Sequence, residues 1–266
     1  MILNEAYTLS NGVKIPRLGL GTWFILDEQA AQAVRTAVPL GYRHFDTAQA
    51  YGNEAGVGEG KLSARLRELV ILAVAAANQT MNEVRRHTIA ALASGVKPEE
   101  IKEAVYHCAP YIGLGKAENA VNVVNEAFAE RGIALPLTSG QTVTEESRLA
   151  DGIAAQKSIF GVQIDAMRAA APEDQKKIQD DLSAYCFGDF YTRRFLTIPE
   201  RELLTFAILA AQGGCEPQVK THVGGNAAVG NGKETLLAAL TVCLPYIGFP
   251  RTLNALACIN EVLPEN

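Results

Sequence analysis

Two histidines stand at matching positions in two related stretches of the chain, and imidazole is the side chain best suited to proton transfer near neutral pH. His87 and His222 are two of only four histidines. Glu83 precedes His87 by four residues, so on a helix the two can form a hydrogen bond that favours a protonated ring. Gln218 holds that place before His222 and can orient the ring without adding charge. The pattern predicts acid–base chemistry, with a purely structural histidine as the alternative.

Two more carboxylates repeat in the same way. Glu68 follows Arg67, and Glu202 follows Arg201, each near the start of an apolar helical stretch. An acid there is stabilised by the helix dipole. Glu68 and Glu202 are therefore either catalytic groups or acids that favour the helix start, and the sequence leaves both readings open.

An arginine pair precedes the second stretch. Arg193 and Arg194 stand in the segment YCFGDFYTRRFL. Guanidinium groups can bind a substrate carboxylate through two parallel hydrogen bonds. A solvated basic pair is the alternative.

The cysteines do not form a metal-binding or disulfide pattern. There are five of them, mostly within apolar stretches and without a CxxC or CxxH spacing: Cys108, Cys186, Cys215, Cys243 and Cys258. An odd count without such spacing predicts reduced thiols. We expect no metal site and no cofactor.

These residues belong to a segment that the chain contains twice. Residues 67–131 and 201–266 share one register from the histidines onward. The matching pairs include Gly95 and Gly230, Cys108 and Cys243, Tyr111 and Tyr246, Gly113 and Gly248, Asn119 and Asn254, and Glu126 and Glu261. A register of this length indicates a duplicated structural unit.

Each copy is predicted to be helical throughout. The apolar periodicity places helices at 66–77, 82–93, 97–112 and 117–131, and again at 200–213, 215–229, 232–247 and 251–263. Pro110 and Pro245 are expected to kink the last turn of the third helix in each copy. Residues 136–142 form a polar linker, and helices after a Thr142 or Thr144 cap and over 172–187 precede the second copy alone.

The first 62 residues follow a different pattern. Asn11-Gly12 lies between β-prone runs and predicts a hairpin. A helix over 28–40, capped by Asp27 and ended by Gly41, precedes a short strand over 42–45. Hairpin, strand, helix and strand are the opening of a βα protein.

Composition excludes several classes of protein. The 266 residues are 48% hydrophobic and 20% charged, enough for a packed core and a polar surface. The formal net charge of −5, without a basic block, argues against nucleic acid as a partner. No uninterrupted apolar run reaches about 18 residues, and the N-terminus lacks the regions of a signal peptide. We expect a cytoplasmic protein that contacts neither membrane nor nucleic acid.

The first segment resembles the opening of an aldo-keto reductase, in NGVKIPRLGLGTW and GYRHFDTAQAYGNEAGVGEG. The resemblance implies that Asp46 and Tyr51 match catalytic positions, with the tyrosine donating a proton to a carbonyl that takes hydride from NADPH. It stops after about 60 residues, whereas a (β/α)8 barrel needs about 200 or more. We therefore interpret Asp46 and Tyr51 as relics.

The rest of the chain resembles the carboxymuconolactone decarboxylase family. The motifs are RELxxLAxxAA, ExxxHxxxALxxG and a helix ending in YxGxPxxxNA, preceded by a segment like YCFGDFYTRRFL that carries Arg193. The resemblance implies a mainly α fold of two alkylhydroperoxidase D-like units in tandem after the short β-hairpin and βαβ-like segment. It also implies a homo-oligomer, here a homotrimer of tandem chains that is pseudo-hexameric.

A peroxidase branch of this fold places cysteines seven and four residues before the histidine. Thr80 and Glu83 hold these positions in the first copy, and Cys215 and Gln218 in the second. Neither copy has both thiols, so an intramolecular disulfide cycle cannot run. Cys215 is the one possible redox residue.

We therefore predict three segments, over residues 1–62, 63–135 and 136–266. The preferred function is His-assisted decarboxylation of a small carboxylated lactone or related unsaturated acid, with His222 as the better candidate than His87. The alternatives are a thiol oxidoreductase, a non-catalytic helical oligomer that binds a ligand, and a carbonyl reductase that uses the first segment.

Overall fold

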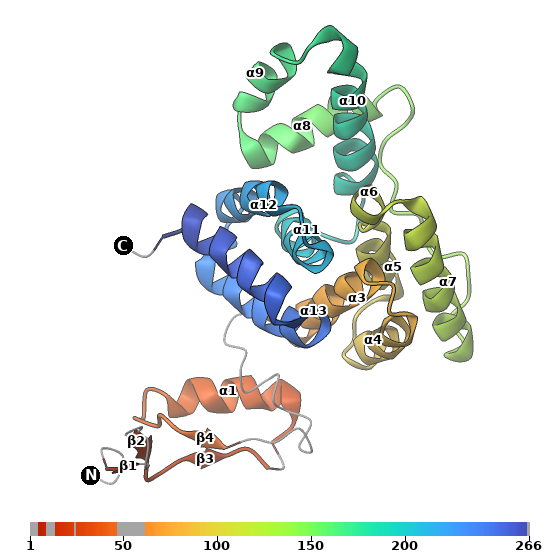
Figure 1. The fold of residues 1–266 in the computed structure, drawn as a ribbon. Coiled ribbons are helices and arrows are strands. Elements are labelled where there is room, and N and C mark those ends of the chain that lie inside the picture. The colour runs from red at the N-terminus through yellow and green to blue at the C-terminus, as the bar shows by residue number, and fades with distance from the viewer. Residues whose placement is uncertain (1–4, 9–13, 24, 47–61, 265–266) are drawn as a thin grey trace. The chain divides into compact units, whose positions relative to one another are not determined.

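A computed structural model describes residues 5–8, 14–23, 25–46 and 62–264. The chain divides into two compact units, Met1–Ala64 and Arg65–Asn266 (Figure 1). Each unit is described by itself below.

The first unit contains the predicted hairpin and a βαβ element. β1 (Ala6–Thr8) pairs antiparallel with β2 (Lys14–Pro16), and the Asn11-Gly12 turn lies outside the described residues. β3 (Leu20–Gly21) pairs parallel with β4 (Phe45–Asp46). The connecting helix α1 (Asp27–Ala37) is one residue longer at its start and three shorter at its end than predicted, and its N-cap is Leu26 rather than Asp27. A parallel pair joined by a helix is how a barrel begins.

The first copy of the repeat begins with a helix that is buried on all sides. α3 (Ala64–Ala77) is followed by α4 (Met81–Ala93), and Gly95 then adopts a positive φ of 78°. Every residue of α3 from Arg67 to Ala77 is buried, which explains its nearly continuous apolar sequence. α4 packs against α7 (Leu114–Glu130).

The third helix of this copy differs from the prediction. Instead of one helix reaching Ile112 with a kink at its end, the structure has α5 (Pro98–Tyr106) and a separate short α6 (Ala109–Ile112). Pro110 lies at the start of α6. Its ring would clash with the carbonyl of residue 106 if the helix continued, so the helix stops there.

The second copy repeats the plan with α11 (Ile198–Gln212), α12 (Glu216–Ala228) and α13 (Lys233–Val262). Thr197 and Glu200 form a capping box at the start of α11. Gly248 has φ 72° and ψ 167° and divides α13 into two helical segments, near the predicted boundary. The predicted architecture, mainly helical with two copies in tandem, is confirmed.

Among the described helices, α13 is the one that is long and apolar enough to cross a membrane, judged only by its length and composition. An 18-residue window within it has a mean hydropathy of 1.4. The non-helical Gly248 lies within α13, and the helix packs against α11 and α12. Of that apolar window, 28% is buried within the described structure.

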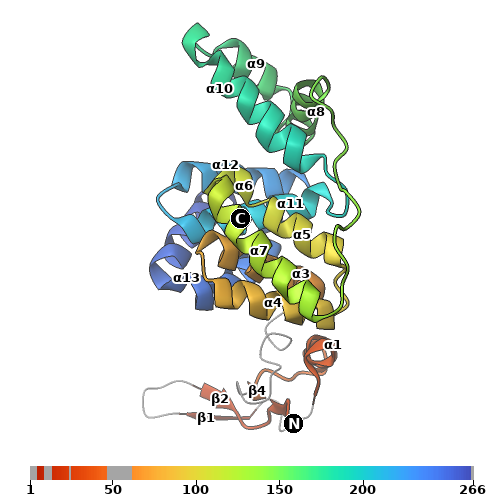
Figure 2. The same ribbon diagram turned by 90° about the vertical axis from the view of Figure 1, so that its right-hand side faces the viewer.

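The segment before the second copy forms a helical cap, set off from the two copies in Figures 1 and 2. It contains α8 (Arg148–Phe160), α9 (Gln163–Ala169), η3 (Glu173–Gln175), α10 (Lys176–Asp181) and η4 (Leu182–Tyr191). α9 was not predicted, and the helix expected over 172–187 continues to Tyr191 as a π-helix. Thr144 and Ser147 exchange hydrogen bonds between side chain and backbone before α8, whereas Thr142 bonds Thr192 instead.

Glycines allow α8 and η4 to pack in backbone contact. A Cβ atom on Gly152 would lie 2.0 Å from the carbonyl oxygen of Ser183. One on Gly188 would lie 2.2 Å from the carbonyl oxygen of Arg148, whose side chain also pairs with Asp189. This close packing fixes η4 and the side chains that it directs into the second copy.

Substituting Gly152 by Ala should push α8 away from η4, because backbone cannot move aside as a flexible side chain can. We expect the free energy of unfolding to fall by about 1–3 kcal/mol, measured by urea denaturation. Gly115→Ala is the matched control on α7, where an added Cβ would have nothing within 4 Å, and it should be neutral or slightly stabilising. Equal stabilities of the two variants would contradict the close packing.

Candidate functional site

A buried carboxylate holds the histidine in each copy. Nδ1 of His87 lies 2.7 Å from Oε2 of Glu68, and Nδ1 of His222 lies 2.9 Å from Oε2 of Glu202. Both glutamates are the fifth residue of their helices, outside the first turn where the dipole would favour them. Their position therefore supports the reading as site residues.

Each pair also meets a tyrosine from the opposite copy. The hydroxyl of Tyr246 lies 3.0 Å from Nε2 of His87. The rings of Tyr111 and His222 pack edge to face with centroids 6.4 Å apart. These two tyrosines are the repeated Tyr of the Pro-Tyr-Ile-Gly segments, so the two copies exchange equivalent residues.

The two sites differ at the second ring nitrogen. Nε2 of His87 contacts the hydroxyl of Tyr246, and Oε2 of Glu83 lies 3.7 Å from it, beyond a hydrogen bond. Among the described residues no group hydrogen-bonds Nε2 of His222. Gln218 does not bond the His222 ring either, although the two line one cavity. His222 therefore has a ring nitrogen free for a ligand.

The cavity beside His222 has a volume of about 380 Å³. Its lining is mostly apolar and aromatic: Pro110, Tyr111, Ile178, Asp181, Leu182, Tyr185, Cys186, Phe187, Leu209, Gln218 and His222. No arginine or lysine is among these residues. A small, mostly apolar molecule fits such a lining better than a polyanion does.

A chain of hydroxyl groups supports Glu202. The Tyr191 hydroxyl donates to Oε1 of Glu202 over 2.6 Å and lies 2.8 Å from Oγ1 of Thr205. Thr205 lies 2.9 Å from the hydroxyl of Tyr111. Burial raises the pKa of both tyrosines well above the usual range, so they remain hydrogen-bond donors. Glu202 thus has a hydrogen bond on each oxygen.

These bonds determine the tautomer of His222. An ionised carboxylate only accepts hydrogen bonds, so Nδ1 carries the hydrogen that lies between the ring and Glu202. In the neutral ring Nε2 then has the lone pair, and in the charged ring it has a proton to donate. Both forms direct the reactive nitrogen away from Glu202.

A close approach of helices makes room for Glu202. A Cβ atom on Gly225 would lie 2.5 Å from Oε2 of Glu202 and 2.9 Å from the ring of Phe160. Phe160 in turn packs edge to face on His222 with centroids 5.6 Å apart. Because residue 225 is a glycine, α12 can pack closely against both the Glu202 side chain and α8.

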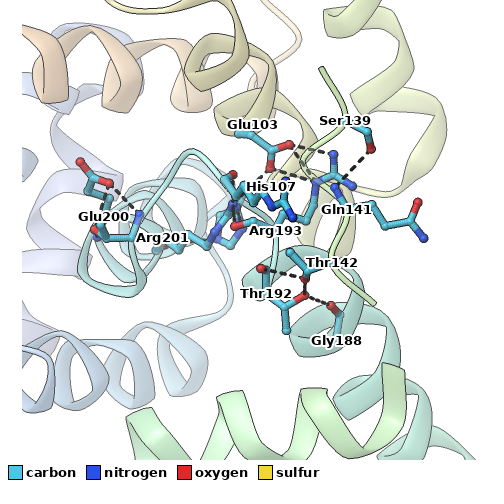
Figure 3. Close-up of polar contacts among 12 residues, drawn as sticks. Glu103, His107, Ser139, Gln141, Thr142, Gly188, Thr192, Arg193, Glu200 and Arg201 are labelled. Atoms are coloured by element: carbon cyan, nitrogen blue, oxygen red, sulfur yellow. Dashed lines mark hydrogen bonds and ion pairs between the residues drawn. The ribbon is translucent and has the colours of Figure 1, made fainter. Parts of the chain in front are cut away.

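Arg193 lies elsewhere, in a buried charge cluster (Figure 3). Its Nε and Nη2 donate to the Glu103 carboxylate over 2.9 and 2.7 Å, and Arg201 donates to the same group over 3.1 Å. Arg194 is exposed and bonds Gly140 through its backbone. The structure does not bring either arginine into the lining of the cavity beside His222, where the predicted carboxylate contact would require one.

His107 connects this charge cluster to the hydroxyl chain. Its Nε2 lies 2.9 Å from Oγ1 of Thr205 and 3.2 Å from the carbonyl oxygen of Arg201. A carbonyl only accepts, so Nε2 carries the hydrogen and Nδ1 can accept from Arg201 Nη1 at 3.4 Å. Burial, and then the Arg201 charge, hold the pKa of His107 well below 6.5.

The thiols are poorly placed for redox chemistry. Cys215 donates to the carbonyl of Leu209 over 3.3 Å, and burial raises its pKa. Burial raises the pKa of Cys186, beside Tyr111, to about 12. The described residues contain no group of three or more metal-binding side chains. In the first unit Asp46 is exposed at the end of β4, while Tyr51 lies outside the described residues.

Fold and site together define a helical tandem-repeat protein with a carboxylate–histidine pair in each copy. The chain belongs to the Carboxymuconolactone decarboxylase family, whose sequence profile matches residues 43–126 and 176–261. The predicted family membership is confirmed. The first match begins before the boundary predicted at residue 62.

A short N-terminal stretch is similar to aldo-keto reductases, as predicted. An uncharacterized oxidoreductase of Schizosaccharomyces pombe is 54% identical over 57 residues, which are 21% of this chain and 18% of that protein. The 9,11-endoperoxide prostaglandin H2 reductase of Trypanosoma cruzi is 56% identical over 54 residues, or 20% of this chain and 19% of that protein. The chain thus spans about a fifth of the length of these curated relatives.

Sequence reasoning missed the residues that join the two copies. It noted Tyr111 and Tyr246 as part of the repeat but gave them no site role, and it did not consider Tyr191, Thr205 or His107. The repetition of the tyrosines was an available signal. Tyr191 and Thr205 gave none, because the partners of each lie in other parts of the chain: Glu202 for Tyr191, and Tyr111, Tyr191 and His107 for Thr205.

Gly225→Ala should displace the Glu202 carboxylate and weaken its hold on His222. We expect a loss of about 1–3 kcal/mol in unfolding free energy and changed NMR chemical shifts of the His222 ring. Gly224→Ala, one residue earlier on the same helix, would place its new Cβ in open space and should change neither. Unaltered His222 ring shifts in Gly225→Ala would show that this contact does not position the ring.

His107 should make the protein sensitive to acid. A depressed pKa in the folded state means that the unfolded chain binds the proton more readily, so the stability that neutral His107 contributes is present above about pH 6.5 and is lost as the pH falls below that value. His107→Gln should lose less stability than the wild type between pH 7.5 and pH 5, measured by urea denaturation. Parallel pH curves would mean that His107 is not buried in its neutral form.

Proposed function

We propose that the second copy carries a decarboxylase site, with His222 as the proton donor and a small carboxylated lactone or related unsaturated acid as the substrate. One observation carries the proposal: Glu202 fixes Nδ1 of His222 and leaves Nε2 free beside a cavity of about 380 Å³. Family membership supports the same reaction class.

The reaction would proceed by cleavage of the bond between the substrate's carboxylate and its ring carbon. The electron pair of that bond passes into the conjugated lactone as CO2 leaves, and the resulting enolate takes a proton from Nε2 of His222 on carbon. The ring then regains a proton from water. Glu202 accepts the Nδ1 hydrogen throughout and stabilises the charged ring electrostatically.

The apolar lining would assist the loss of CO2. A carboxylate in this cavity exchanges water for Phe187, Leu182 and Tyr185, and its charge becomes more dispersed as the bond breaks. Protonated His222 would be its cationic partner among the lining residues. Asp181 would disfavour a second carboxylate nearby, which favours a substrate with a single acid group.

The first copy is less suited to this reaction. Nε2 of His87 already contacts Tyr246, so a substrate would have to displace that hydroxyl before it could reach the nitrogen. We propose that His87, Glu68 and Glu83 maintain the fold of their copy while His222 and Glu202 perform the chemistry.

The same substitution in both copies tests this assignment. His222→Gln should lower kcat for decarboxylation by about 10²–10⁴-fold, the usual contribution of a positioned acid. His87→Gln should retain most of the activity of the folded protein. CO2 release from a panel of carboxylated lactones measures both, and circular dichroism confirms that each variant is folded.

Glu202→Gln provides the second arm of the experiment. It preserves size but removes the charge that supports the imidazolium, so kcat should fall more than KM rises. Full activity in His222→Gln would overturn the proposal. Absence of turnover across lactones and peroxides, with a small ligand retained in native mass spectrometry, would favour a binding protein instead.

A further inference from the structure

A second cavity, of about 320 Å³, lies on the side of the Glu103 cluster formed by α5 and the segment after α7. It is lined by Glu99, Lys102, Glu103, Tyr106, Asn125, Leu135, Pro136, Leu137, Thr138, Ser139 and Arg193. None of these residues lines the cavity beside His222. We propose that this second cavity binds a small carboxylate with an apolar body.

Lys102 is the main reason for this assignment. The residue is 7% exposed, and its ammonium group donates to Oδ1 of Asn125. Within the described ranges it forms no ion pair, although a buried ammonium ordinarily requires one. Burial also lowers the pKa of Lys102, as expected for a cation without a compensating anion.

The charges in the lining and directly behind it leave a positive excess. Glu103 is already shared between Arg193 and Arg201, as Figure 3 shows, and it accepts both arginines with its two oxygens. Glu99 is the remaining carboxylate of the lining. Arg201 is fully buried behind the lining, so the cluster as a whole has three cations and two carboxylates, and an added anion would balance them.

Tyr106 indicates where the anion would lie. Nζ of Lys102 and Cζ of Arg193 each lie 5.3 Å from the centre of its ring. Both cations are therefore directed toward one aromatic group within the same cavity. A carboxylate near Tyr106 would be within reach of both.

The apolar part of the lining selects the rest of the ligand. Leu135, Pro136 and Leu137 line the cavity together with the Tyr106 ring. Inorganic phosphate would leave these groups uncovered, whereas a carboxylate on a flat or aliphatic body would contact them. A monocarboxylate fits best, because Glu99 would repel a second charge.

Isothermal titration of the full-length protein with benzoate tests the proposal. We expect saturable binding that is at least about tenfold weaker for benzyl alcohol, which lacks the charge, and for inorganic phosphate, which lacks the apolar body. Lys102→Met should weaken benzoate binding about tenfold or more, since it removes the unpaired cation but keeps the length of the side chain. Equal binding of benzoate by this variant would overturn the proposal.

Three further variants sharpen the result. Lys116→Met removes the same charge from an exposed position on α7 and should leave benzoate affinity within about twofold. Glu99→Gln should increase affinity, because it removes a repelling carboxylate. His222→Gln should leave binding here unchanged, which separates this cavity from the proposed decarboxylase site; a loss of binding in that variant alone would assign benzoate to the other cavity.

Discussion

The carboxylate of Glu202 is fully buried within helix α11, and side chains from two other helices provide its hydrogen bonds. An ionised group removed from water is costly unless it is paired and hydrogen-bonded on each oxygen. His222 provides one bond and Tyr191 the other. Tyr191 belongs to η4, so the helical cap has a direct role in stabilising the charge that orients the histidine.

The two copies hydrogen-bond their buried glutamate in different ways. Glu68 in the first copy also bonds a histidine, but its second oxygen contacts Arg67 rather than a tyrosine from a helical cap. The position of Thr205 is occupied by Ile71 there, so the hydroxyl chain cannot form. Tyr246 then reaches the free nitrogen of His87 directly. The histidine nitrogen opposite the glutamate is thus covered by a tyrosine in the first copy and without such a contact in the second.

Glu103 organises a second buried set of charges. It receives Arg193 and Arg201, and His107 connects this set through Thr205 to the tyrosines near Glu202. Arg193, which the sequence suggested as a substrate contact, is thereby committed to holding η4 and α11 to α5. Its ion pair with Glu103 is shielded from solvent, so loss of Glu103 would leave the charges of Arg193 and Arg201 without their shared carboxylate.

The sequence by itself determined the duplication, the helical class, the family and the histidines. Periodic apolar residues and a shared register are local properties that survive without knowledge of contacts. It also favoured the second copy as the better candidate, because the first copy lacks the leading helices, and this stays a prediction. Helix ends near Pro110 and the π-helix of η4 were less accessible, because they depend on how neighbouring helices pack.

Only the tertiary structure decided which side chains meet. Glu68 and Glu202 could equally have been acids that favour a helix start, and their partners lie 19 and 20 residues away on the next helix. Tyr111 reaches the site of the other copy, which no spacing within one copy can reveal. Arg193 had two possible anions, a substrate or Glu103, and burial against α5 selected Glu103. Which buried charges pair with each other depends on how the helices pack in three dimensions. The architecture could therefore be predicted from the sequence, whereas the contacts within the site could be identified only from the tertiary structure.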